Sequence, residues 1–132
     1  MTSPPDDIDE EERELALLEA ERLMELGRIE YEESRFDKAL ACLRDALAHF
    51  KTHKHRTGEG RAFGTLGAVY RNRGEYDEAI AHFNQALAIV RQIGDKRSEG
   101  LALNGLGLIS YKLGEFAQAI PHFVQALAIH RE

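Results

Sequence analysis

GEYDEAIAHFNQALAI at residues 74–89 returns almost unchanged as GEFAQAIPHFVQALAI at residues 114–129. A repeat period of roughly 20–50 residues is typical of arrays in which one supersecondary unit is stacked on copies of itself. At this 40-residue offset similar residues coincide along the whole copy, for example Gly67 on Gly107, Gly74 on Gly114, Tyr76 on Phe116 and Phe83 on Phe123. A weaker third copy aligns one further step upstream, where Ser34 replaces the glycine of the later copies.

Within each copy the apolar residues recur at the spacing of two amphipathic helices. In the second copy one stripe comprises Phe63, Leu66, Gly67 and Tyr70, and the other comprises Ala79, Phe83, Ala86, Leu87 and Val90. Gly74 between the stripes suits a left-handed helix C-terminus and a tight hairpin, and Gly114 is expected to do the same. We therefore predict helices at residues 8–32, 36–52, 58–73, 76–92, 97–113 and 116–131.

A glycine inside a helix costs about 1 kcal/mol relative to alanine, so Gly67 needs a reason in packing. We predict that it allows close approach of the helix carrying Ala79 and Phe83, and that Gly27 and Gly107 repeat the device. Since no strand pattern is present and one hairpin cannot bury its own stripe, the predicted fold is all-α. Its architecture is an α-solenoid of three antiparallel helix hairpins, with six helices.

The stripe residues also carry a family resemblance. Leu66, Gly67, Tyr70, Ala79, Phe83 and Ala86 have the spacing L-G-x2-Y…A-x3-F…A, and the chain resembles the tetratricopeptide repeat family. Its 40-residue period and its connector IGDKRSEG (93–100) are similar to the longer repeats of the Pins/LGN polarity adaptors and of many bacterial multidomain regulators. The resemblance implies a superhelical single domain over residues 8–132, with repeats at about 20–56, 60–96 and 100–132, after an acidic arm at residues 1–7.

Stacked hairpins of this kind curve, and the first helix of each hairpin lines the concave side. The stripe out of phase with the packing stripe contains Glu21, Met24, Glu25, Arg28, Tyr31 and Glu32, then Arg61, Gly64, Thr65, Ala68, Arg71 and Asn72, then Leu101, Asn104, Gly105, Leu108, Tyr111 and Lys112. We predict a partner-binding groove for a peptide or helix, formed by Arg28, Arg61, Thr65, Arg71, Leu101, Asn104, Leu108, Tyr111 and Lys112. The open alternative is that these positions are only solvated.

The sequence ends at Arg131-Glu132, directly after an Ala-Leu-Ala-Ile run. This leaves an outward apolar face on the last hairpin, formed by Ile120, Phe123 and Leu127, without a polar capping helix. Either the chain is a fragment of a longer array, or another copy or a partner covers this face. The alternative function is therefore a structural module that forms a homodimer or higher oligomer through its C-terminal helix pair.

Charge divides the chain into two regions, with a net −10 in residues 1–33 and +4 in residues 34–132. The basic residues are scattered along helical periods beside an acidic terminus, so nucleic-acid binding is not expected. No apolar run is long enough to span a membrane, and the single Cys42 indicates a reduced, cytoplasmic location. A further hypothesis is that residues 6–14 fold back on Arg61 and Arg71 as an internal competitor.

No pattern for catalysis, a cofactor or a metal is evident. Nothing resembles a nucleophile elbow or a phosphate loop, and the glycines of GEGRAFGTLG lie in register with the other helices. The histidines His49, His53 and His55 lie close together, but neighbouring lysine and arginine side chains disfavour a cation. Cys42, His82 and His122 share one repeat position, and stacked repeats hold such positions about 10 Å apart, too far for joint coordination. We predict a protein-binding scaffold without enzymatic activity.

Overall fold

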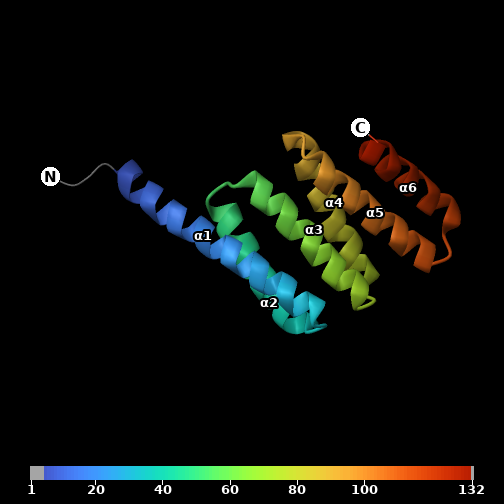
Figure 1. Cartoon of the computed structure of the whole chain (residues 1–132), viewed down its shortest axis with the longest axis horizontal. Helices are drawn as coiled ribbons and strands as arrows, with labels where there is room; N and C mark the ends of the chain where they lie inside the picture. The colour runs from blue at the N-terminus through green and yellow to red at the C-terminus, as the bar shows by residue number, and fades with distance from the viewer. Residues whose placement is uncertain (1–4, 132) are drawn as a thin grey trace. The chain divides into compact units, whose positions relative to one another are not determined.

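The computed structural model describes residues 5–131, with side chains from residue 10 onward, and within this range every regular element is an α-helix (Figure 1). The helices are α1 (Pro5–Glu32), α2 (Phe36–Thr52), α3 (Arg56–Asn72), α4 (Tyr76–Ile93), α5 (Lys96–Lys112) and α6 (Phe116–Arg131). The predicted all-α fold of helix hairpins is confirmed. The largest boundary difference is at α1, which begins at Pro5 rather than at residue 8. Of the expected acidic arm, residues 1–4 lie outside the described range.

The chain divides into two compact units, Met1–His55 and Arg56–Glu132. The first unit contains the hairpin of α1 and α2. The second unit contains the hairpins α3–α4 and α5–α6, and α5 also packs against both α3 and α4 (Figure 1). Two stacked hairpins in one unit provide the arrangement that a helical repeat requires, because the stripe of one hairpin is covered by the next.

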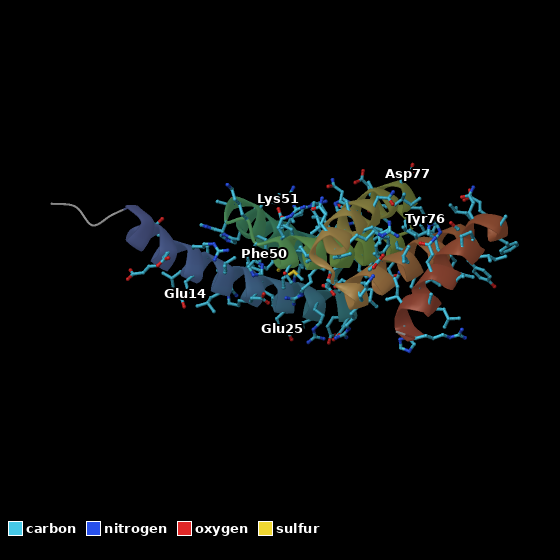
Figure 2. All side chains as sticks on the ribbon, turned by 90° about the horizontal axis from the view of Figure 1, so that it is seen from above. Glu14, Glu25, Phe50, Lys51, Tyr76 and Asp77 are labelled. Atoms are coloured by element: carbon cyan, nitrogen blue, oxygen red, sulfur yellow. The ribbon has the colours of Figure 1, made fainter. Side chains whose placement is uncertain are left out.

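The core of the first unit is the interface between its two helices. Leu43 and Phe50 of α2 are completely buried, and Ala20 of α1 is also inaccessible to solvent. In Figure 2 Phe50 points inward, whereas Glu14 and Glu25 lie on the outer side of α1. This division follows from the helical periodicity of the apolar residues, which places one stripe of each helix against its partner.

The mid-helix glycines lie where helices approach closely, as predicted. A Cβ atom added at Gly67 would lie 2.8 Å from Cδ1 of Phe83, and one at Gly107 would lie 2.8 Å from Cε1 of Phe123. Gly27 has the same role in the first unit, where an added Cβ would lie 2.8 Å from Cγ of Leu43. In each hairpin the low helix propensity of the glycine is therefore offset by the close packing of the two helices.

The turns between paired helices use a left-handed residue. Gly74 and Gly114 have φ values of 77° and 75°, which confirms their predicted role, and Ser34 occupies the same turn position with φ 61°. A side chain in this region of backbone space clashes with the following carbonyl oxygen, so glycine is the residue that adopts it without cost. The first hairpin therefore has a strained turn that the other two avoid.

Candidate functional site

The predicted groove residues of the second unit lie on two neighbouring helices, α3 and α5. Arg61, Asn104 and Lys112 are exposed, as are Leu101 and Tyr111 with 62% and 59% of their surface accessible. The three other predicted residues are half-buried, namely Thr65, Arg71 and Leu108. Together they form a solvent-facing surface with cationic, amide and large apolar side chains, which we call the α3/α5 face.

Two stripe positions from the sequence prediction are wrong. Gly105 is buried, because its backbone lies over the ring of Phe83, where an added Cβ would come within 2.4 Å of Cζ. Met24 is only 7% exposed and belongs to the core of the first unit. Helical spacing alone does not separate these positions from the exposed stripe, since a residue at the edge of the stripe faces whichever helix is stacked beside it.

Arg28, the groove residue predicted in the first unit, is engaged along its own helix. Its guanidinium donates to the carboxylates of Glu25 and Glu32, and all three side chains are about half exposed. The hydrogen bonds to Glu25 and then Glu32 raise the pKa of Arg28, and the bond from Arg28 lowers the pKa of Glu25. Two acids surround one base here, so this part of α1 presents negative rather than positive charge.

Arg71 and Tyr111 occupy equivalent repeat positions but have different contacts. The guanidinium carbon of Arg71 lies 5.9 Å from the ring centroid of Phe83, a cation–π arrangement that holds the stem of the side chain on the core. The ring of Tyr111 lies 5.5 Å from that of Phe116, at the turn of the last hairpin. Arg71 is thus part of the packing, whereas Tyr111 keeps most of its surface available.

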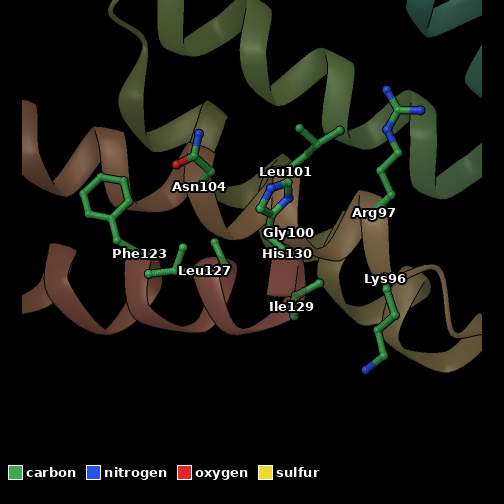
Figure 3. Close-up of a pocket in the computed structure, with 10 residues that line it drawn as sticks. Lys96, Arg97, Gly100, Leu101, Asn104, Phe123, Leu127, Ile129 and His130 are labelled. Atoms are coloured by element: carbon green, nitrogen blue, oxygen red, sulfur yellow. The ribbon is translucent and has the colours of Figure 1, made fainter. Parts of the chain in front are cut away.

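A pocket of about 710 Å³ opens between α5 and α6 (Figure 3). It brings together Leu101 and Asn104, predicted for the groove, with Phe123 and Leu127, predicted for self-association. Lys96 and Arg97 lie at one end of the pocket, and Phe123 and Asn104 lie at the other. The remaining lining residues were not predicted as site residues, namely Gly100, Ala126, Ile129 and His130. We call this the α5/α6 pocket.

The signal that could have revealed these residues is the repeat itself. Ile129 corresponds to Ile89 and His130 to Val90 at the 40-residue offset, and both earlier residues are almost inaccessible to solvent. Ile89 and Val90 lie against Gly60 of α3, in a hairpin on which α5 also packs. The positions buried in that hairpin therefore indicate which residues are left open on α5–α6. The third predicted face residue, Ile120, is 61% exposed but does not line the pocket.

The histidine positions have structural partners. Nδ1 of His82 lies 2.8 Å from the carbonyl oxygen of Glu78, and Nδ1 of His122 lies 3.0 Å from that of Gln118, so both rings bond back to their own helix. Burial raises the pKa of the Cys42 thiol, which disfavours the thiolate that binds metals. Among the described residues no three His, Cys, Asp or Glu side chains gather in a metal-binding arrangement.

Comparison with known proteins places the repeat in a family. Residues 58–132 match the family model described as tetratricopeptide repeat. The chain belongs to the tetratricopeptide repeat family. Among solved structures, the tetratricopeptide repeat domain of Arabidopsis FLU is similar, with a TM-score of 0.78 at 22% identity, over 88% of this chain and 95% of that one. No curated protein matches the sequence.

At this level of identity the FLU domain supports the fold alone. Tetratricopeptide repeats generally act as protein-interaction scaffolds, and this general role applies to the family to which the chain belongs. No helix within residues 5–131 has the combination of length and apolar content required to cross a lipid bilayer.

Proposed function

We propose that this tetratricopeptide repeat protein is a scaffold without catalysis of its own, and that it binds a peptide or helix of a partner on the α3/α5 face. The observation that carries the proposal is the exposure of Leu101 and Tyr111, each with more than half of its surface accessible, on helices that also present cations. Large apolar side chains surrounded by polar ones are characteristic of protein-binding surfaces.

The chemistry of the face indicates the kind of segment it accepts. Arg61 and Lys112 supply positive charge, Asn104 supplies an amide that can pair with a peptide backbone, and the apolar residues supply an anchor. The ligand expected is therefore an extended or helical segment with acidic residues and at least one large apolar side chain. Arg28 is not included in this surface, because its charge is offset by Glu25 and Glu32.

A displayed library of random peptides, selected on the immobilised protein, tests this proposal. Selected peptides are expected to be enriched in acidic and large apolar residues. Their affinity, measured by fluorescence polarisation, should fall at least tenfold for the double variant Arg61→Glu/Tyr111→Ala, since charge and anchor are both lost. Equal affinity for the variant and the wild-type protein would overturn the proposal.

The matched control is Lys38→Glu/Leu113→Ala. Lys38 is an exposed cation on α2, and Leu113 is an exposed apolar residue just after α5, but neither belongs to the α3/α5 face. This control removes the same kinds of side chain from other places and should leave the affinity unchanged. If both double variants lose binding equally, the selected peptides recognise general charge rather than the face.

Self-assembly is the second candidate function, and one specific observation favours it. The α5/α6 pocket is lined by Phe123, Leu127 and other apolar residues at repeat positions that are buried in the preceding hairpin. A surface of this composition gains free energy when another helix covers it.

A further inference from the structure

The α5/α6 pocket has an occupied counterpart inside the same unit. On the preceding hairpin the equivalent residues Phe83, Leu87 and Val90 are at most 6% exposed. Gly105 of α5 lies over Phe83, and Val90 packs against Gly60 of α3. On the last hairpin, by contrast, Leu127 is 48% exposed and His130 is exposed. The surface on which α5 packs in α3–α4 is therefore repeated on α5–α6 as an open pocket, and in the preceding hairpin the element that packs there is a helix.

The charge around the pocket limits what that helix can be. Residues 96–131 contain four Lys and Arg residues and two acidic residues. One of the acids, Glu99, is buried and accepts a 2.9 Å hydrogen bond from Arg91 of α4, and it also pairs with Lys96. With Lys96 and Arg97 at one end of an apolar surface, the complementary ligand is an acidic amphipathic helix.

The first half of α1 has this chemistry. Leu15 and Leu18, one turn apart, are 68% and 61% exposed, although leucine is usually buried. Around them, residues 10–21 contain six Glu residues and one Arg, and Glu14 projects from the outer side of α1 in Figure 2. This segment combines an exposed apolar pair with strong negative charge on one helix.

Part of α1 extends beyond α2, the helix with which it pairs. α1 contains 28 residues and α2 only 17. Nε of Arg13 donates a 3.2 Å hydrogen bond to the carbonyl oxygen of His53, the residue that follows the last turn of α2. Residues before Arg13 therefore extend past the end of α2, and Leu15 and Leu18 follow Arg13 within the next two turns of α1, where their side chains are exposed.

We propose that the acidic half of α1 from one copy of this chain docks in the α5/α6 pocket of a second copy, with Leu15 and Leu18 on the Leu127 side of the pocket and the glutamates near Lys96 and Arg97. A symmetric contact between two α5/α6 pockets is disfavoured, since both surfaces carry the same sign of charge. The contact is head-to-tail, so each docked copy presents its own pocket to the next. This interaction goes beyond the peptide-binding function proposed above. Its pocket shares Leu101 and Asn104 with the α3/α5 face but also needs α6 residues such as Leu127.

A single helix in a groove buries less than the 1,200–2,000 Å² or so typical of stable protein complexes, and part of the attraction is between exposed charges. The association is therefore weak, reversible and sensitive to salt. In sedimentation velocity the wild-type protein is expected to show an average mass that rises above the 14.9 kDa of one chain as its concentration increases. The rise should decrease in high salt. A constant monomer mass at all concentrations would overturn the proposal.

Two variants and their mixture test the head-to-tail geometry. Leu127→Glu disables the pocket, and Leu15→Lys/Leu18→Lys disables the helix; all three leucines are exposed, so the core is retained. Each variant alone should remain monomeric, because it lacks one of the two surfaces. Their equimolar mixture should form a heterodimer, since one intact helix meets one intact pocket, and the mass should not grow beyond a dimer. A mixture that stays monomeric overturns the proposal.

Matched controls separate this contact from other associations. Leu113→Glu changes a leucine with the same 48% exposure as Leu127 but outside the pocket, and Leu26→Lys/Ile29→Lys changes another exposed pair on α1. Both controls should associate like the wild-type protein. If Leu15→Lys/Leu18→Lys also still associates, the occupant is another surface and the proposal is wrong. Arg61 and Tyr111 belong to the α3/α5 face but do not line the pocket, so Arg61→Glu/Tyr111→Ala should lose peptide affinity and still associate like the wild-type protein, and the two proposals can fail independently.

Discussion

The hairpins α3–α4 and α5–α6 have nearly the same sequence pattern but different surroundings. Phe83 and Phe123 occupy equivalent positions and face equivalent glycines, Gly67 and Gly107. Phe83 is 3% exposed because Gly105 of α5 lies over its other side, whereas Phe123 is half-buried at the edge of a pocket. The comparison teaches that a repeated sequence specifies which surface needs cover, while the neighbouring helix decides whether the surface is covered.

The largest effect is expected from truncating the two phenylalanines. Phe83→Ala should lower the free energy of unfolding by about 3–5 kcal/mol, since it leaves a cavity between three helices. Phe123→Ala should cost less than half as much, because its ring is already partly hydrated and the pocket can admit water. Urea denaturation followed by circular dichroism measures both. Equal losses would contradict the difference in packing between the two hairpins.

A smaller difference is expected at the glycines. In Gly67→Ala the new methyl group meets the ring of Phe83, which Gly105 holds from the other side, so we expect a loss of about 1–3 kcal/mol. In Gly107→Ala the ring of Phe123 can move toward the pocket, and the gain of about 1 kcal/mol in helix propensity offsets the contact. Thermal unfolding of the two variants should give a clearly lower midpoint for Gly67→Ala only. A similar decrease for both would show that Phe123 is held as firmly as Phe83.

The turns extend the comparison to the first hairpin. Ser34→Gly should stabilise the protein by about 1 kcal/mol because it relieves a left-handed serine, and Gly74→Ser should destabilise it by a similar amount. The two substitutions are reciprocal at one repeat position, so each serves as the control of the other. Denaturant midpoints measure the shifts. Shifts of the same sign would mean that turn strain is not the cause.

The smallest effect is expected at the exposed ring pair of the last hairpin. Tyr111→Arg introduces the residue found at the same position of the second repeat and removes the contact with Phe116, for a loss of about 0.5 kcal/mol. Tyr31→Arg in the first hairpin, where the ring lies 6.1 Å from Phe36, should have a similar effect. Differential scanning calorimetry can resolve both shifts. A loss several times larger at Tyr111 would show that this residue supports the core rather than the surface.

Much of the fold could be predicted from the sequence because its causes are local. Five of the six helices begin and end within two residues of the predicted bounds, since apolar periodicity and turn glycines act over a few residues. The approach of Gly67 to Phe83 could also be predicted, because repetition shows that the glycine is retained in each copy. The resemblance to the tetratricopeptide repeat added the stacking of hairpins.

The candidate site could be predicted only in part. Exposure of Leu101 and Tyr111 agrees with the α3/α5 face, but the burial of Gly105 and the contact of Arg71 with Phe83 do not follow from spacing. The burial of Gly105 depends on how α5 stacks on the preceding hairpin, and the contact of Arg71 with Phe83 depends on how α3 and α4 are rotated against each other. Both arrangements result from many weak contacts between different helices. The surroundings of a side chain at the edge of a stripe therefore cannot be predicted from the sequence of its own helix.

By itself, the sequence determined the six helices, their left-handed turns and the apolar stripe that each hairpin presents, because those properties arise within one or two helical turns. Only the tertiary structure decided that Phe83 and Leu87 are buried, with Gly105 of α5 over Phe83, while Phe123 and Leu127 line an open pocket. The physical reason is that hydrophobic burial depends on which surface lies opposite. Two copies of one pattern therefore have different environments and, we infer, different roles.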